Sequence, residues 1–301
     1  MSEIHLDRLQ TETRNEQTKE LDQMTIHEML RLMNQEDQSV PRAIEKELPI
    51  IEKAIKAIIH SFEQGGRLIY MGAGTSGRLG VLDAAECVPT FSVDPGMVIG
   101  LIAGGEKAML HAVEGAEDSE ELAINDLKEL DLTEKDAVVG IAASGRTPYA
   151  IGGLKYAREK GAYTISLSCN KESKVSHYAD AAIEVETGPE VLTGSTRLKA
   201  GTAQKLVLNM LSTLSMVGIG KVYQNLMIDV QPSNLKLEER AKRIIMEATD
   251  ATYEEAEKVF ESSKHRVKTA IVMQLTGTSK EEAEDKIKAA NGFIRPAISE
   301  E

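Results

Sequence analysis

Apolar residues in the first part of the chain recur at helical spacing. From about residue 17 they follow one another at steps of three and four: Leu21, Met24, Ile26, Met29, Leu30 and Met33. A second set begins after Pro41 and stops before Gly65 and Gly66: Ile44, Leu48, Ile51, Ala54, Ile55, Ile58 and Ile59. Residues at this spacing share one face of an α-helix. The pattern therefore predicts two N-terminal helices whose apolar faces contact a core.

From residue 67 to residue 185 the pattern changes to short apolar runs separated by helical stretches. The runs have the length of buried strands: 67–71, 98–103, 137–142, 163–168 and 181–185. Helical patterns lie between them: 79–85, 109–130 and 149–160. Short runs without alternation are typical of parallel strands that helices cover on both faces. The order of strands and helices predicts an α/β fold with a doubly wound, mostly parallel sheet.

The final third of the chain is helical in pattern and contains two kinds of sequence. Residues 198–217 are rich in Leu, Met and Ala but are interrupted by Lys199 and Lys205, so we expect a buried helix of a protein core and not a membrane span. After Pro232 come charged helical segments: 235–248, 252–260, 267–275 and 279–291. We predict one domain over residues 1–231, which includes the N-terminal helices, and a small helical domain over residues 232–301.

The composition limits the partners and the location of the protein. The chain has 301 residues and a formal net charge of −13, which argues against nucleic acid because binding its backbone requires a basic surface. No apolar run approaches the length of a membrane span, and the N-terminus is polar. Cys87 and Cys169, the two cysteines, lack the spacing of a zinc site or a disulfide framework. We expect a cytoplasmic protein with reduced thiols, no metal and no cofactor.

A glycine-rich segment, Gly72-Ala-Gly-Thr-Ser-Gly-Arg78, follows the first predicted strand. Glycines permit a tight turn, while the hydroxyls of Thr75 and Ser76 and the amides of the following helix can bind an anion. The segment also fits the spacing G-x-G-x-x-G, with Asp94 where a dinucleotide-binding domain would carry its ribose-binding acid. Both a phosphate site and a dinucleotide site are compatible with this segment alone.

Two further hydroxyl-rich loops favour the phosphate site. Ser144 and Thr147 follow the third predicted strand, and Ser195 and Thr196 precede the long apolar helix. Ligands of open α/β sheets bind at the carboxyl ends of the strands, so several such loops can converge on one phosphate. The alternative is that each loop is an ordinary turn or helix cap, which Ser, Thr and Gly also favour.

These loops supply the candidate phosphate ligands, and two glutamates supply the candidate chemistry. The ligands we expect are hydroxyls from all three loops: Thr75, Ser76, Ser144, Thr147, Ser195 and Thr196. The arginines beside them, Arg78, Arg146 and Arg197, either assist or are solvated. Glu86 lies at the predicted end of the helix after the glycine segment, before Pro89, and Glu117 follows the Gly104-Gly105 turn. Free carboxylates near a bound substrate can transfer protons.

The same motifs, taken in order, resemble those of the N-acetylmuramic acid 6-phosphate etherases. The resemblance rests on long segments: 72–80, 83–87, 112–118, 142–148, 193–205 and 292–297. It implies a sugar isomerase type domain followed by a small helical domain, in a homodimer that binds a phosphosugar. It also implies that Glu86 corresponds to the acid that serves the leaving group and Glu117 to the second catalytic glutamate.

The resemblance implies a lyase that releases D-lactate from C3 of the sugar and leaves N-acetylglucosamine 6-phosphate. The open-chain sugar has an aldehyde that acidifies the C2 proton, so elimination followed by water addition is easier than direct hydrolysis. We expect Glu117 to remove the C2 proton and Glu86 to protonate the departing oxygen, although these roles are exchangeable. Two alternatives stay open, namely a phosphosugar-sensing regulatory protein without catalysis and an aldose-ketose isomerase.

Overall fold

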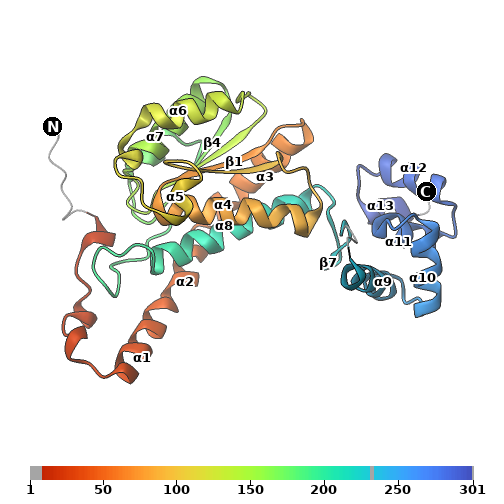
Figure 1. Cartoon of the computed structure of the whole chain (residues 1–301), viewed down its shortest axis with the longest axis horizontal. Coiled ribbons are helices and arrows are strands. Elements are labelled where there is room, and N and C mark those ends of the chain that lie inside the picture. Colours follow the sequence, from red (N-terminus) through yellow and green to blue (C-terminus); the bar gives the residue numbers. More distant parts are fainter. Residues whose placement is uncertain (1–8, 231–233, 300–301) are drawn as a thin grey trace. The chain divides into compact units, whose positions relative to one another are not determined.

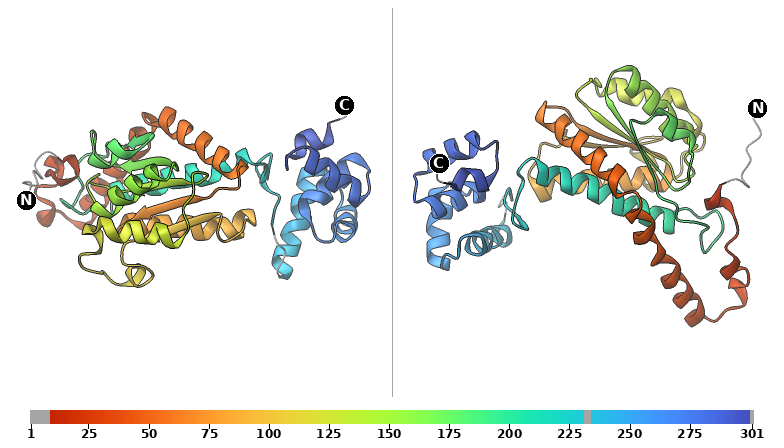
Figure 2. Two further views of the ribbon diagram at one scale, coloured as in Figure 1. Left: turned by 90° about the horizontal axis from the view of Figure 1, so that it is seen from above. Right: turned by 180° about the vertical axis from the view of Figure 1, so that it is seen from behind.

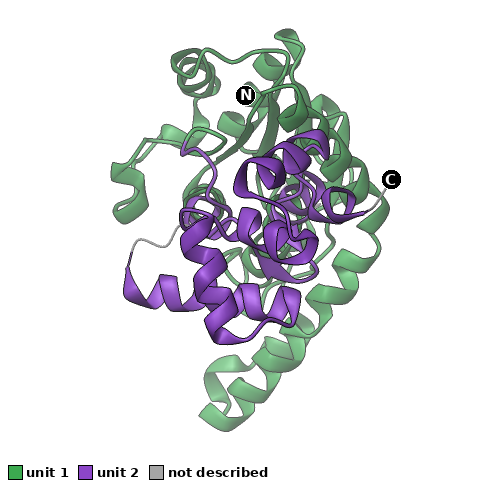
Figure 3. Cartoon of the chain, turned by 90° about the vertical axis from the view of Figure 1, so that its right-hand side faces the viewer, with its two compact units in different colours: residues 1–85, 96–212 green, residues 86–95, 213–301 purple. Residues whose placement is uncertain are grey.

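The computed structural model describes residues 9–230 and 234–299, which form two compact units (Figure 3). Unit 1 consists of residues 1–85 and 96–212, and unit 2 consists of residues 86–95 and 213–301. The domain boundary that the sequence predicts between residues 231 and 232 lies outside the described residues and stays a prediction.

Unit 1 begins with short 3₁₀ turns and three helices. The turns are η2 (Gln10–Glu12), η3 (Glu16–Thr18) and η4 (Leu21–Gln23), and the helices are α1 (Ile26–Asp37), α2 (Ser39–Glu45) and α3 (Leu48–Glu63). The first predicted helix therefore starts later than expected, at a capping box formed by Thr25 and Glu28. The apolar face of α3 is buried as predicted, with Ile51 and Ile58 in the core.

The apolar face of α1 does not contact the core. The helix contains no buried residue, and Ile26 and Leu30 are 70% and 63% exposed. The prediction of a core contact is wrong here because helical periodicity identifies a face suited to burial but not the surface that covers it. An exposed apolar stripe of this kind is typical of a surface that contacts another protein.

The sheet of unit 1 has five parallel strands, as the sequence predicts (Figure 1). They are β1 (Leu68–Gly72), β2 (Val98–Ile102), β3 (Ala137–Ile141), β4 (Tyr163–Ser168) and β5 (Ala181–Glu184). Their order is β2-β1-β3-β4-β5, and every residue of β1 and β3 is buried. The chain leaves β1 toward one side of the sheet and β3 toward the other, so the order reverses between these two strands. Ligands of such sheets bind at this reversal.

Helices cover both faces of the sheet (Figures 1 and 2). On one face lie α6 (Glu120–Glu129) and α7 (Pro148–Glu159), whose residues pack on Ile69, Met71 and Val138. On the other face lie α3 and the unit 1 parts of α4 (Gly74–Phe91) and α8 (Lys199–Gly218). Short elements complete the unit: α5 (Lys107–Leu110), η5 (Ala116–Asp118) and η6 (Lys174–Tyr178). The fold is thus the doubly wound α/β fold that the sequence predicts.

Unit 2 is a small helical unit with its own core. A two-stranded hairpin, β6 (Val222–Tyr223) and β7 (Leu226–Met227), precedes five helices. These are α9 (Leu235–Thr249), α10 (Tyr253–Ser262), α11 (Val267–Thr276), α12 (Lys280–Ala289) and α13 (Ile294–Ile298). They pack around the fully buried Phe260, so the predicted helical segments are confirmed. Within residues 9–230 and 234–299, no helix is both long and apolar enough to cross a membrane.

Candidate active site

The turn between β1 and α4 is tighter than the sequence suggests. We expected a helix from residue 79, but α4 begins at Gly74, so Thr75 and Ser76 lie in its first turn. Gly74 has φ +54°, which allows the chain to reverse direction directly after the strand. The helix also continues to Phe91, past the expected stop at Pro89. An exposed proline in the last turn removes one backbone hydrogen bond, which this helix tolerates.

Two glycines bring the start of α4 against the end of β1. A Cβ atom on Gly77 would lie 2.5 Å from the carbonyl oxygen of Gly72 and 2.7 Å from Cγ1 of Ile102. A Cβ atom on Gly72 would lie 2.8 Å from the amide nitrogen of Gly77. Because no side chain fits between them, the helix backbone touches the strand backbone. The free amides of the first turn are thereby held at the carboxyl edge of the sheet, where an anion can bind.

Ser76 is held by a residue that the sequence analysis did not single out. Its side chain is buried, and its Oγ donates a hydrogen bond of 3.0 Å to Oε1 of Gln204 on α8. The Nε2 atom of Gln204 is buried and has no hydrogen-bond partner among the described residues. The signals for it were its polarity inside the mostly apolar segment 198–217 and its place in the motif 193–205. The Ser76 hydroxyl is therefore engaged here, while its amide belongs to the first turn of α4.

The loop after β3 lies beside the turn after β1, because Gly72 pairs with Ile141 in the sheet. In this loop Oγ of Ser144 accepts a hydrogen bond of 3.3 Å from the amide of Arg146. Thr147 is the N-cap residue of α7, but its side chain makes no capping hydrogen bond. The explanation of Thr147 as an ordinary cap therefore does not apply, and its hydroxyl can serve a ligand.

The third loop reaches the same region but does not present an open helix end. A Cβ atom added to Gly201 of α8 would lie 3.5 Å from Cγ2 of Thr75 and 3.6 Å from the carbonyl oxygen of Thr196. The two threonines therefore flank α8. The first amides of α8, those of Lys199 and Ala200, donate to the buried carboxylate of Glu190 at 2.8 and 2.9 Å. Burial raises the pKa of Glu190, although these backbone hydrogen bonds favour its charged form. The N-terminus of α8 is thus already occupied.

Glu117 lies beside the glycine-rich turn. It follows Gly115, which has φ +74°, and its side chain lines a cavity of about 260 Å³ together with Gly74 and Arg78. The guanidinium of Arg78 donates to the carbonyl oxygens of Ala108 and Met109 at 2.9 and 3.0 Å. Arg78 therefore fixes α5, lines the same cavity as Glu117 and is not simply a solvated charge.

Glu86 lies on α4, twelve positions after Gly74, and is exposed. Glu86 belongs to unit 2 and Glu117 belongs to unit 1. Of the eight predicted site residues, Thr75, Ser76, Ser144, Thr147, Ser195, Thr196 and Glu117 thus belong to unit 1 and Glu86 does not.

Two solved structures have a similar fold. A phosphoheptose isomerase from Neisseria gonorrhoeae matches with a TM-score of 0.51 and 17% identity, over 64% of this chain and 98% of that one. A phosphoheptose isomerase from Francisella tularensis matches with a TM-score of 0.50 and 18% identity, over 64% and 100%. At such low identity the two structures support the fold alone.

Sequence comparison identifies the family. The SIS domain family matches residues 117–214, and the glucokinase regulatory protein N-terminal SIS domain family matches residues 50–158. The N-acetylmuramic acid 6-phosphate etherase of Exiguobacterium sp. is 66% identical over 97% of this chain and 100% of its own. N-acetylmuramic acid 6-phosphate etherase 2 of Lactiplantibacillus plantarum is 64% identical over 98% and 100%. With this identity over nearly its whole length, the chain belongs to the N-acetylmuramic acid 6-phosphate etherase family.

Proposed function

We propose that this protein is a carbon–oxygen lyase that converts N-acetylmuramic acid 6-phosphate and water to N-acetylglucosamine 6-phosphate and D-lactate. The observation that carries the proposal is the 66% identity to an etherase over 97% of this chain and 100% of that one. The tight turn after β1 and the carboxylate of Glu117 in the adjoining cavity are consistent with it.

The phosphate of the substrate binds at the reversal of strand order. Its oxygens accept hydrogen bonds from the first-turn amides of α4 and from the hydroxyls of Ser144 and Thr147. Ser195 and Thr196 supply hydroxyls from the third loop. Ser76 contributes its amide and, if Gln204 donates to its oxygen instead of accepting from it, its hydroxyl as well.

The two glutamates carry out the proton transfers. In the open-chain sugar the Glu117 carboxylate takes the C2 proton, and the electrons of that bond form the C2–C3 double bond as the C3–O bond breaks. Protonated Glu86 gives its proton to the departing lactate oxygen. Glu86, now a carboxylate, activates water for addition at C3, and the C2 proton is restored. Each proton transfer contributes on the order of 10²- to 10⁴-fold in rate.

We further propose that the active form is a homodimer in which Glu86 and Glu117 of one site come from different subunits. Glu117 belongs to unit 1 and Glu86 to unit 2, so the two glutamates are not held within one compact unit. The exposed apolar face of α1 and the exposed Leu82 on α4 supply surface for a second copy. Cytoplasmic location and the absence of a nucleic acid partner stay predictions.

Release of D-lactate from N-acetylmuramic acid 6-phosphate, measured by an enzymatic lactate assay, tests the proposed function. If the parent protein releases no lactate, the proposed function is wrong. Interconversion of aldose and ketose phosphates would instead favour an isomerase. In heavy water the parent incorporates deuterium at C2. Glu117→Gln should lose this exchange, while Glu86→Gln should keep exchange but lose at least about 100-fold in lactate release. Full turnover in either variant removes that residue from the mechanism.

Mixing the two inactive variants tests the subunit arrangement. In a heterodimer of Glu86→Gln and Glu117→Gln subunits, one site collects both intact glutamates only if they come from different chains. Random assortment then restores about one quarter of the parental activity. If both glutamates act from one chain, every site keeps one defect and the mixture stays inactive. That result rejects the shared site but leaves the etherase function intact.

A further inference from the structure

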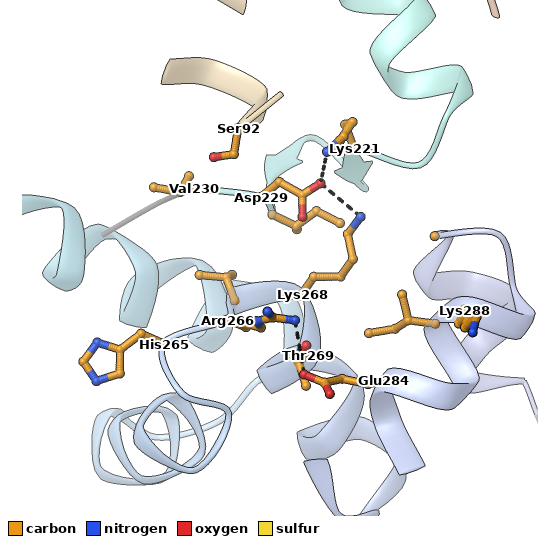
Figure 4. A pocket seen from close by; sticks show the side chains of 14 residues that line it. Ser92, Lys221, Asp229, Val230, His265, Arg266, Lys268, Thr269, Glu284 and Lys288 are labelled. Atoms are coloured by element: carbon orange, nitrogen blue, oxygen red, sulfur yellow. Dashed lines mark hydrogen bonds and ion pairs between the residues drawn. The ribbon is translucent and has the colours of Figure 1, made fainter. Parts of the chain in front are cut away.

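A cavity of about 500 Å³ lies within unit 2 (Figure 4). It is bounded by the start of α11, by α12 and by residues 228–230, and all of its lining residues belong to unit 2. Sites for small molecules have volumes of this order. None of the residues proposed above for catalysis or phosphate binding lines this cavity, so it is a candidate for a second ligand.

One side of the cavity holds two ammonium groups and one carboxylate. Asp229 Oδ2 lies 3.2 Å from Nζ of Lys221 and 3.1 Å from Nζ of Lys268, and Figure 4 shows both lysines converging on it. Lys268 also donates to the carbonyl oxygen of Gly220 at 2.9 Å. The Lys268 side chain is only 14% exposed. A single carboxylate between two cations leaves one positive charge without a partner in a largely desolvated place.

The opposite side of the cavity also has more cationic side chains than carboxylates. Glu284 lies 3.3 Å from Arg266 and is also paired with Lys280 at 2.9 Å. Lys288 lines the cavity as well. Among the described residues, the lining thus carries four cationic side chains and two carboxylates, an excess of two positive charges in a protein of formal net charge −13. Such a local excess attracts anions.

Two further features point to an anion at the centre of the cavity. Burial lowers the pKa of Lys268, although Asp229 opposes this change, so its ammonium lacks stabilisation that an anion would supply. Helix α11 starts at Val267, and its N-cap residue Arg266 makes no side-chain capping bond. The first-turn amides of Lys268 and Thr269, which lie on the lining, have no intrahelical acceptor.

We propose that this cavity binds a small phosphate monoester, with the phosphate between Lys221, Lys268 and the first turn of α11. A dianionic phosphate would balance the excess of two positive charges over the whole lining, one of them at Lys221 and Lys268, whereas a monocarboxylate would balance only one. The rest of the wall is apolar and accommodates the organic part of the ligand: Ile228, Val230, Val267 and Ile287. The proposal does not depend on the etherase reaction.

The test is a titration of the full-length protein with inorganic phosphate at constant ionic strength, followed by amide NMR. Because the loops of unit 1 also bind phosphate, the signals observed are the amides of Lys268 and Thr269. These shift in a saturable way if phosphate binds, and acetate at equal ionic strength gives no saturation. Lys268→Met weakens the affinity at least about tenfold, the effect of a charge-assisted hydrogen bond. Lys286→Met, an exposed lysine of α12 outside the lining, leaves it unchanged.

Asp229→Asn provides a test with the opposite sign. Removing the carboxylate that competes for the two lysines tightens phosphate binding, while a purely structural role for these residues predicts weakening or no change. If Lys268→Met does not fold, Lys221→Met replaces it. Three results would each overturn the proposal: no shift of the Lys268 and Thr269 amide signals, an equal loss of phosphate affinity in Lys268→Met and Lys286→Met, or weaker phosphate binding in Asp229→Asn.

Discussion

Asp136 joins the start of β1 to the start of β3, and its replacement tests what holds these strands together. Its side chain is 1% exposed, and it accepts five hydrogen bonds. Arg67 gives three of them, from its amide at 2.9 Å, Nε at 3.0 Å and Nη2 at 2.8 Å. The amide and hydroxyl of Thr133 give the others, at 2.9 and 3.2 Å. Asp136→Asn keeps the shape but replaces one acceptor oxygen with a donor.

The cost of this change can be worked out from the geometry. At least two of the five hydrogen bonds are lost, because an NH₂ group then faces Nη2 of Arg67 and the amide of Thr133. Removing one partner of a buried ion pair costs about 3–5 kcal/mol. Since the Arg67 side chain is 25% exposed, water stabilises part of its charge. We therefore expect about 3 kcal/mol, which corresponds to a decrease of about 6–12 °C in the Tm of a unit of this size.

Calorimetry and urea denaturation of the parent, Asp136→Asn and Glu52→Gln measure this effect. Glu52 pairs with Lys56 on the exposed surface of α3, so its variant is a matched control within unit 1 and should keep the parental midpoint. Burial would raise the pKa of Asp136, but the hydrogen bonds from Arg67 and Thr133 outweigh it and lower the pKa. The stability that Asp136 supplies is thus complete above the unfolded-state value of 3.8 and is lost as the pH falls through the lower folded-state value.

The difference between the parent and Asp136→Asn should therefore be constant near neutral pH and should shrink below about pH 4. A loss under about 1 kcal/mol near neutral pH, or a loss equal to that of Glu52→Gln, would show that the ion pair does not hold the strands. A difference that grows on acidification would show that the sign of the pKa shift is wrong.

Three further predictions concern single residues of the chain. Gly145 has φ +69°, and a Cβ atom there would lie 2.2 Å from Cβ of Ser173. Gly145→Ala should therefore lower the free energy of unfolding of unit 1 by about 2 kcal/mol or more, measured by urea denaturation. It should also raise KM for the phosphosugar, measured by steady-state kinetics. Burial raises the pKa of the Cys169 thiol to about 12, so in a Cys87→Ser background a disulfide reagent at about pH 8 should label it only after unfolding; fast labelling of the native protein would contradict its burial. Asp83 is buried and accepts hydrogen bonds from three side chains at 2.7–3.2 Å. Asp83→Ala should therefore lower the free energy of unfolding, measured by urea denaturation, by about 1–3 kcal/mol. An unchanged urea midpoint would show that this cluster does not contribute to stability.

The sequence was sufficient for the features of the fold that depend on local pattern. Apolar runs of strand length predicted all five strands of the sheet, and the charged segments after Pro232 predicted α9, α10, α11 and α12 of unit 2 but not α13. The predicted boundaries of α4 were wrong at both ends. Glycines disfavour a helix on average, but backbone contact with β1 lets α4 begin at Gly74. Proline usually ends a helix, but Pro89 lies in the last turn and is tolerated there.

Residues that act through distant partners could not be predicted. Gln204 meets Ser76 across 128 positions of the sequence, and Glu190 caps a helix from a loop that has no capping signature. Arg78 was left open between a ligand and a solvated charge, and only the carbonyl oxygens of Ala108 and Met109 decide its role. Likewise, the pattern of α1 could not show that the described part of the chain leaves that face uncovered.

The direct contact between Gly72 and Gly77 has a consequence for how this protein can vary. The distance from the sheet to the amides at the start of α4 is set by two peptide backbones in touch, with no side chain between them. Substitutions elsewhere in the interior can therefore change volume and shape without moving these donors. Core residues are free to diverge while the anion-binding geometry stays the same, so long as these two positions carry nothing larger than a hydrogen atom.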